Sequence, residues 1–240
     1  MSDLVSTPAL PKRFYETVTV EPQDGGFQVK LDGRGIRTPA RASVMFPKVE
    51  VAEACAAEWS AQSDVIDPAT MPVTRLANTV IDGVATQSEL TREDLGRYAE
   101  TDLLAYRAED PERLVRRQAD AWDPIVDWVR QRFGVSLATG TGVMFVRQAP
   151  ETVEALREAV GRETDPFRLA ALHQVTTLTG SLILALALAD GRISSQGLWA
   201  AAHVDEDWNI ELWGEDEEAA RRRDSRFQDL QAAALLLGRA

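Results

Sequence analysis

The chain has 240 residues, of which 45% are hydrophobic and 27% are charged, so it can bury a core in one large domain or two small ones. Its 26 basic and 38 acidic residues give a formal net charge of −12, which argues against a nucleic-acid or anionic-membrane binder, because phosphate contacts need clustered Lys and Arg. The single cysteine, Cys55, excludes an internal disulfide and a cysteine-based zinc site.

The first residues carry no recognisable targeting signal. Residues 1–10 contain no basic residue and no apolar run of signal-peptide length, and Asp3 is unlike an Arg-rich transit sequence. We therefore expect a disordered lead over residues 1–12. Because nothing indicates an oxidising compartment, we also expect a cytoplasmic protein.

Residues 13–46 show the pattern of strands and turns. Apolar and polar side chains alternate over residues 17–20 and 27–31, with a glycine pair between the two runs. Asp32-Gly33 is typical of a type I′ hairpin turn, because both central positions of that turn need positive φ. The sequence predicts a small antiparallel sheet here.

After Pro47 the hydrophobic period becomes helical. We expect a first helix there and further helices over residues 76–85, 88–106, 111–133, 150–161, 165–190, 194–213 and 216–237. Asp110-Pro111 and Asp165-Pro166 each predict an N-cap followed by a proline at the first helical position. The fold class is therefore α+β, with an N-terminal β-rich domain over residues 13–90 and a larger C-terminal helical domain over residues 91–240.

One apolar stretch imitates a membrane span, because residues 169–189 contain no charged side chain and are long enough to cross a bilayer. Its first half, however, contains His173, Gln174 and three threonines. We expect a buried helix and no membrane insertion. The alternative is a membrane-associated factor anchored by residues 182–189.

No motif for catalysis or for cofactor binding is complete. Residues 139–142 read Thr-Gly-Thr-Gly, but Phe145 stands where a dinucleotide fingerprint needs its third glycine, and no Gly-Lys-Ser/Thr follows. No Gly-x-Ser-x-Gly elbow occurs. Cys55 lies among alanines with no adjacent cation to lower its pKa. We expect a structural turn, a small core cysteine, no cofactor and no enzyme activity.

A histidine near the C-terminus supports a second hypothesis. His203 precedes Glu206 and Asp207 by three and four positions, so a helix could direct them to one side, as a metal-dependent hydrolase would need. His173 offers no third ligand. The spacing favours a solvated acidic face, so we expect no metal, and the hydrolase stays the alternative function.

Residues 199–218 combine three tryptophans with eight acidic residues and no basic one. Carboxylates this dense repel one another, so some are expected to await a positively charged partner, and tryptophan is enriched at interaction hot spots. The alternative, that all three tryptophans are core, stays open. The candidate partner-binding residues are Trp199, Asp205, Glu206, Trp208, Glu211, Trp213, Glu215 and Asp216.

Residues 58–82 form a helix end, a proline-punctuated connection and a new helix start. Pro68 and Pro72 keep the connection extended, because each disfavours α geometry in the preceding residue, and Thr74 can cap a helix beginning near Arg75. The distinctive residues of this structural motif are Trp59, Asp67, Pro68, Pro72, Arg75 and Asn78.

This segment resembles the assembly-chaperone family for the alpha subunit of F-type ATP synthase, which comprises a mitochondrial assembly factor and its α-proteobacterial relatives. The chain looks like an α-proteobacterial member that resembles the mitochondrial protein. Other matching motifs are Arg13-Phe14-Tyr15, Leu31-Asp32-Gly33-Arg34, Arg37-Thr38-Pro39, Asp102-Leu103-Leu104, Tyr106-Arg107, Thr179-Gly180-Ser181, Glu206, Trp208 and Trp213-Gly214. The chain departs from the family at Asn209, where Gln is common. The resemblance implies a chaperone that binds the free alpha subunit and prevents its aggregation, with Glu206 and the nearby tryptophans in the functional region.

Overall fold

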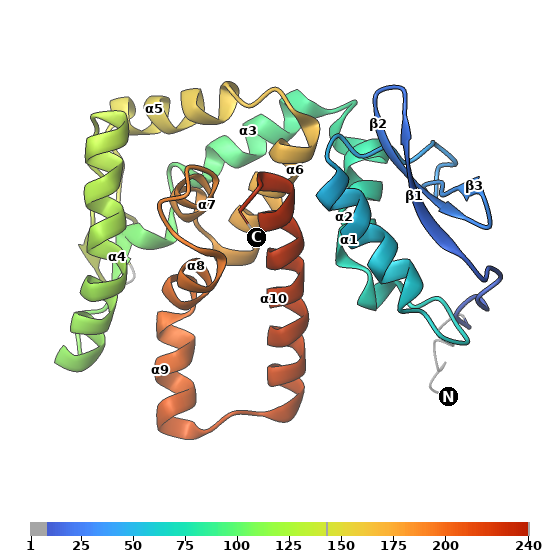
Figure 1. Cartoon of the computed structure of the whole chain (residues 1–240). Coiled ribbons are helices and arrows are strands. Elements are labelled where there is room, and N and C mark those ends of the chain that lie inside the picture. The colour runs from blue at the N-terminus through green and yellow to red at the C-terminus, as the bar shows by residue number, and fades with distance from the viewer. Residues whose placement is uncertain (1–8, 143, 240) are drawn as a thin grey trace, which may run out of the picture. The chain divides into compact units, whose positions relative to one another are not determined.

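The computed structural model describes residues 9–142 and 144–239. They form two compact units, one up to Asp82 and one from Gly83 onwards. The first unit holds a small antiparallel sheet with helices, and the second is mainly helical (Figure 1), which confirms the α+β class. The expected division into domains of residues 13–90 and 91–240 stays a prediction.

The sheet of the first unit has the order β1 (Val18–Gln23), β2 (Gly26–Leu31), β3 (Arg34–Gly35), all antiparallel. Asp32 and Gly33 connect the last two strands with φ values of 47° and 76°, as the predicted turn requires. The chain is held in this unit from Pro11 on, whose carbonyl accepts a hydrogen bond from the Ile66 amide at 2.8 Å. Of the expected disordered lead, residues 1–8 lie outside the described residues.

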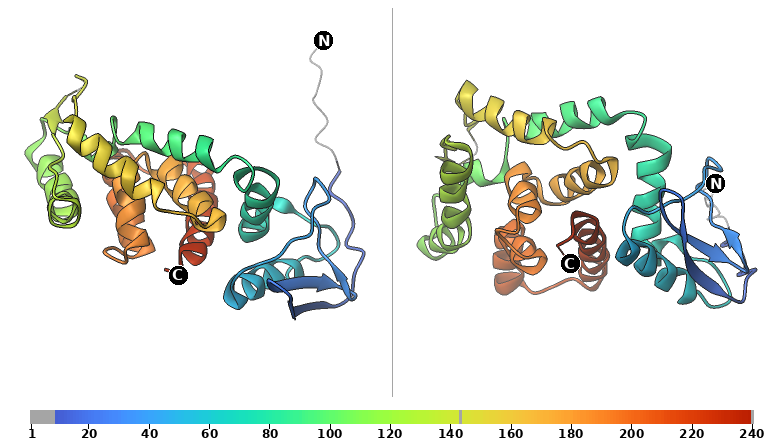
Figure 2. Two further views of the ribbon diagram at one scale, coloured as in Figure 1. Left: turned by 90° about the horizontal axis from the view of Figure 1, so that it is seen from above. Right: turned by 45° about the horizontal axis from the view of Figure 1, so that its top comes forward.

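Helix α1 (Val49–Ser60) covers one face of this sheet, as both views of Figure 2 show. Its alanines favour a helix, and it buries Val51 and Cys55. Burial raises the pKa of the Cys55 thiol to about 12, which keeps it protonated at neutral pH, as expected for an inert core residue. Trp59, at the end of the helix, is half-buried, and its ring meets that of Tyr15 edge to face at 5.7 Å.

The proline-punctuated connection contains a short 3₁₀ turn, η1 (Pro68–Thr70), capped by Asp67, whose carboxylate accepts from the Ala69 amide at 2.9 Å. Helix α2 (Pro72–Thr79) then begins at Pro72, earlier than expected, and it carries Arg75 and Asn78. The motif residues therefore build the turn and the helix that follow α1.

Glu58, not Thr74, caps α2, which corrects the sequence interpretation. Its carboxylate accepts hydrogen bonds from the amides of Val73 and Thr74 at 2.6 and 2.8 Å, and from the Thr74 hydroxyl at 2.7 Å. Sequence reasoning searched for a local cap, whereas this one comes from the preceding helix. Burial is the main influence on Glu58 and raises its pKa.

Glu58→Ala is expected to lower the free energy of unfolding by about 2 kcal/mol, because two backbone donors at a helix start lose their acceptor. Urea-induced unfolding measures the change. Glu53→Ala, on an exposed position of the same helix, is the matched control and should shift stability by less than about 0.5 kcal/mol. Equal effects of the two substitutions would show that the cap contributes nothing.

The helices of the second unit follow α2 through a π-helical turn, η2 (Val80–Val84). In chain order they are α3 (Ser88–Tyr98), α4 (Glu112–Phe133), α5 (Pro150–Gly161), α6 (Pro166–Thr179), α7 (Leu182–Ala189), α8 (Ser195–Ala202), α9 (Val204–Trp213) and α10 (Glu217–Leu237). A 3₁₀ turn, η3 (Leu103–Ala105), precedes β4 (Tyr106–Arg107), which pairs in parallel with β5 (Gly140–Thr141). The Thr-Gly-Thr-Gly stretch thus supplies β5.

Two expected long helices are each broken in two. The helix expected over residues 165–190 ends at Gly180, which has a φ of 71°, and Ser181 caps the next helix by accepting from the Leu184 amide at 3.0 Å. The helix expected over residues 194–213 breaks at His203. The apolar period continues across both breaks, so periodicity alone could not reveal them.

Of the two aspartates expected to cap helices, one does so and the other does not. Asp165 caps α6 as expected, accepting from the Phe167 amide at 2.9 Å. The prediction for Asp110 is wrong, because Pro111 is itself the residue before α4 and no side chain of residues 9–142 or 144–239 caps that helix. Gly134 ends α4 with a φ of 73°, the left-handed geometry that glycine adopts without strain.

Helix α7 is the centre of the second unit, and its residues Leu182–Leu188 are buried. It packs on α4, α6, α8 and α10, which confirms the expected buried helix. Among the described residues, no helix has both the length and the apolar character that crossing a membrane requires.

Asp102 joins two of the motifs that carry the family resemblance. Its fully buried carboxylate accepts hydrogen bonds from the Leu104 amide at 3.0 Å, the Ser181 hydroxyl at 2.7 Å and the Ile183 amide at 2.9 Å. The Leu103 amide donates to the Gly180 carbonyl at 3.0 Å. The start of α7 is therefore fixed to the turn before β4.

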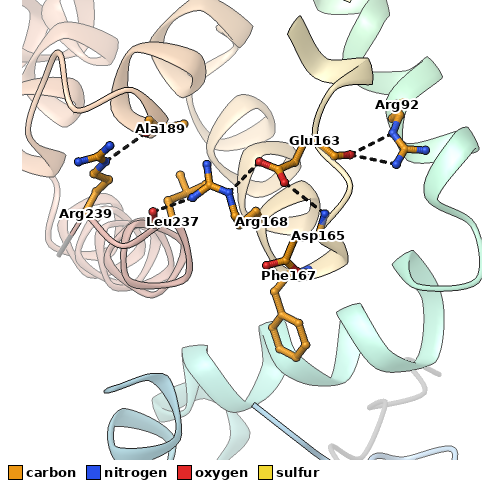
Figure 3. Close-up of polar contacts among 8 residues, drawn as sticks. All are labelled: Arg92, Glu163, Asp165, Phe167, Arg168, Ala189, Leu237 and Arg239. Atoms are coloured by element: carbon orange, nitrogen blue, oxygen red, sulfur yellow. Dashed lines mark hydrogen bonds and ion pairs between the residues drawn. The ribbon is translucent and has the colours of Figure 1, made fainter. Parts of the chain in front are cut away.

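Arginine side chains fasten the ends of several helices (Figure 3). Arg168 of α6 donates to the Leu237 carbonyl at 2.9 Å and pairs with Glu163 at 2.7 Å, while Arg239 donates to the Ala189 carbonyl at 3.1 Å. These bonds satisfy carbonyls that have no partner within their own helix. The last turn of α10 is thereby held against α6.

Candidate functional site

The candidate partner-binding residues lie on α8, on α9 and in the turn that leads into α10. Helices α9 and α10 run in opposite directions and are joined by residues 214–216 (Figure 1). The candidate partner-binding residues all belong to the second unit, whereas the structural motif of residues 58–82 belongs to the first.

The three tryptophans occupy three different environments. Trp208 is buried, and the guanidinium groups of Arg113 and Arg117 lie 5.3 and 5.5 Å from its ring. Trp199 is half-buried against the ring of His203, at 3.8 Å between centroids. Trp213 is 84% exposed. Neither sequence alternative, all core or all surface, describes the three together.

Arginines from other helices reach the acidic residues of α9. Glu211 pairs with Arg113 and Arg117 of α4, both at 2.5 Å, and Asp207 pairs with Arg223 of α10. Although desolvation acts to raise it, the pKa of Glu211 is held below its usual value by the hydrogen bond and charge of Arg113. The expected unpaired acidic cluster is therefore partly neutralised from within.

Two further acids have structural partners. Asp205 accepts from the Gln118 amide nitrogen at 2.7 Å, and Asp216 caps α10 by accepting from the Glu218 and Ala219 amides. Glu215 is exposed and has no polar partner among the described residues. Among the candidate acids, Glu215 and the half-exposed Glu206 thus have carboxylates that accept no hydrogen bond from another described residue.

The histidine of the metal hypothesis is buried and already bonded. His203 Nδ1 lies 2.8 Å from the Trp199 carbonyl, and its Nε2 lies 3.6 Å from the Glu206 carboxylate. Burial is the largest influence on His203 and lowers its pKa. The part of the chain that the structure describes holds no group of three or more metal-ligating side chains. The hydrolase alternative gains no support.

An exposed apolar pair closes α9. Leu212 is 51% exposed and Trp213 is 84% exposed, and Glu215 follows directly after the turn at Gly214. We call Leu212, Trp213 and Glu215 the α9 tip. Sequence reasoning missed Leu212, because it continues the four-residue spacing of the buried Val204 and Trp208, a pattern that predicts burial.

The chain is similar to known proteins over most of its length. Residues 12–130 match the model of a family described as ATP12 chaperone protein. The solved structure of Atp12 from Paracoccus denitrificans is 42% identical with a TM-score of 0.85, covering 95% of this chain and 97% of that one. The solved structure of the Atu1473 protein from Agrobacterium tumefaciens is 47% identical with a TM-score of 0.89, covering 96% and 86%. The mitochondrial protein atp12 of Schizosaccharomyces pombe is 24% identical over 240 residues, covering 95% and 82%.

Proposed function

Because the chain belongs to the ATP12 chaperone family, we propose that it assists assembly of F-type ATP synthase by binding the free alpha subunit and preventing its aggregation. It does this without catalysing a reaction, and it acts in the cytoplasm. The family membership and the sequence motifs support this role. From the geometry of the second unit we further propose that the α9 tip is the surface that contacts the alpha subunit.

The exposure of Leu212 and Trp213 is the observation that carries the proposal. Trp213 and Leu212 are exposed to water at the end of a helix. Covering their apolar surface with a partner lowers the free energy by about 25 cal/mol for each Å² that is buried. A subunit that has not yet met its assembly partner exposes apolar surface of the same kind. Mutual burial would protect both surfaces from aggregation.

The reachable carboxylates give the contact its orientation. Glu206 and Glu215 lie on α9 and directly beyond it, and they favour a client surface that presents basic side chains beside its apolar patch. Release then needs only a competitor that binds the alpha subunit more tightly, for which we propose the beta subunit. No nucleotide hydrolysis is required for this cycle.

Binding of the purified alpha subunit tests the proposed function directly. Equal amounts of the two proteins, mixed and separated by size-exclusion chromatography, should elute together as a complex. Addition of the beta subunit should then transfer the alpha subunit out of that complex. Separate elution of chain and alpha subunit at micromolar concentration would contradict the proposal.

Glu206→Lys is expected to weaken binding of the alpha subunit by about tenfold and to leave folding largely intact, because the side chain is 43% exposed and lies in an acidic surface. Titration calorimetry measures the affinity, and circular dichroism checks the fold. Glu93→Lys, an exposed change of equal charge on α3, should leave affinity unchanged. Unfolding of Glu206→Lys alone would make Glu206 a structural carboxylate.

A further inference from the structure

The first unit has a groove that the proposed function does not use. It is a hollow of about 530 Å³ beside β3, and we call it the β3 groove. The side chains that matter for its chemistry are Phe14, Leu31, Arg34, Ile36, Arg37 and Trp59. Its volume falls in the range of sites that bury a ligand group.

The groove has an apolar floor and an aromatic wall. Leu31 and Ile36 are buried beneath it, whereas Phe14 remains 72% exposed at its side. The ring of Phe14 meets Tyr15 edge to face at 5.4 Å, and Tyr15 meets Trp59 in the same way at 5.7 Å. Packing against Tyr15 positions the Phe14 ring without covering it, so an apolar group entering the groove finds a preformed wall.

The rim of the groove is basic, although the chain as a whole carries a net charge of −12. The Arg34 side chain has no ion-pair or hydrogen-bond partner among the described residues, and the side-chain hydrogen bond found for Arg37 goes to the Arg41 carbonyl at 2.9 Å. Lys30 of the same sheet, in contrast, is paired with Glu21 at 2.5 Å. In the described part of the chain, the guanidinium groups of Arg34 and Arg37 are therefore not paired with a carboxylate.

One carboxylate, that of Asp32, also borders the groove, but it is already engaged. It accepts hydrogen bonds from the Glu16 amide at 3.1 Å, and from the Thr17 amide and hydroxyl, both at 2.9 Å. The Thr17 hydrogen bonds are the main reason that the pKa of Asp32 is lowered. Its charge is directed to the loop before β1, and the two arginines remain the groups available to a ligand.

We propose that the β3 groove binds an acidic segment of a partner protein, with one apolar or aromatic side chain inserted against Phe14 and its flanking carboxylates on Arg34 and Arg37. Guanidinium groups suit this role because they bind carboxylates in a planar, two-bonded geometry. The site is a second docking surface, separate in its residues from the α9 tip. It does not depend on the identity of the alpha subunit as client.

The test uses the full chain and a fluorescein-labelled, end-blocked peptide, Gly-Glu-Asp-Leu-Trp-Glu-Asp-Gly, with binding followed by fluorescence anisotropy. Two control peptides separate the contributions. One replaces every Glu and Asp by Gln and Asn, and the other replaces Leu-Trp by Ala-Ala. The acidic aromatic peptide should bind at micromolar to millimolar concentration, and both controls should bind at least about tenfold more weakly.

Matched variants test whether the peptide binds in the β3 groove. Arg34→Glu and Phe14→Ala should each weaken binding about tenfold or more, whereas Lys48→Glu, an exposed change of equal charge outside the groove, should weaken it less than about threefold. Arg34→Lys keeps the positive charge but not the planar, two-bonded geometry, so it should weaken binding less than Arg34→Glu does. Circular dichroism would check that each variant is folded.

Three results would overturn the proposal. They are no anisotropy change at millimolar protein, equal binding of the amide control peptide, and equal loss in Arg34→Glu and Lys48→Glu. The alpha subunit takes no part in this assay, so a negative result would not contradict the proposed chaperone function. Likewise, failure to bind the alpha subunit would not contradict peptide binding in the β3 groove.

Discussion

Replacing Asp102 by alanine is expected to lower the free energy of unfolding by at least about 3 kcal/mol near pH 5, measured by urea denaturation followed by circular dichroism. Three buried donors, on Leu104, Ser181 and Ile183, lose their acceptor, and each unsatisfied donor costs about 1–3 kcal/mol. The start of α7, the most buried helix of the second unit, would lose its anchor.

The loss of unfolding free energy caused by Asp102→Ala is expected to become smaller as pH rises. Burial, the largest influence, raises the pKa of Asp102 from 3.8 to about 6 in spite of its hydrogen bonds. A carboxyl group with a raised folded pKa stabilises the protein most below its unfolded value, and that contribution is lost as pH rises through about 6. The cost of Asp102→Ala should therefore be about 1 kcal/mol larger near pH 5 than near pH 7.

The prediction for Asp102 has a control variant and a result that would contradict it. Asp120→Ala, on an exposed position of α4, should change stability by less than about 0.5 kcal/mol at either pH. If the cost of Asp102→Ala grew with pH instead, the three hydrogen bonds would outweigh burial and the carboxylate would be charged throughout.

Changing both Leu212 and Trp213 to serine is expected to weaken binding of the alpha subunit by about 30-fold or more, because truncating an aromatic hot spot typically costs at least about 2 kcal/mol. Both side chains are largely in water, so the free energy of unfolding should stay within about 0.5 kcal/mol of the parent. Titration calorimetry with purified alpha subunit and urea denaturation measure the two quantities.

The second unit offers a matched control for this double variant. Met144 and Phe145 form another adjacent, exposed apolar pair, at 77% and 63%. Changing both to serine removes comparable apolar surface from a different part of the unit and should leave binding unchanged. If both double variants bound the alpha subunit equally well, the α9 tip would not be the contact.

Local sequence signals predicted the elements whose cause is itself local. The type I′ turn at Asp32-Gly33 and the cap at Asp165 follow from residues within the same few positions. Periodicity located nearly every helix, but it could not show the breaks at Gly180 and His203, because apolar residues continue on both sides. The fold class was therefore predictable, and the division of the long helices was not.

The candidate surface depended on contacts between distant residues, which a single sequence does not reveal. The eight acids of residues 199–218 have no basic residue among them. Arg113 and Arg117, on α4 and far away in sequence, nevertheless neutralise part of the cluster, and so does Arg223 from the following helix, α10. The exposure of Trp213 and the burial of Trp208 likewise depend on where neighbouring helices lie. Composition singled out the candidate region, and packing determines which of its residues are exposed.

Light scattering of the isolated alpha subunit tests the central claim most directly. Purified alpha subunit, diluted from denaturant, should stay in solution when an equimolar amount of the chain is present and should aggregate in its absence. The Leu212/Trp213 double variant should protect poorly, and the Met144/Phe145 double variant should protect like the parent. Aggregation of the alpha subunit at the same rate with and without the parent chain would contradict the account.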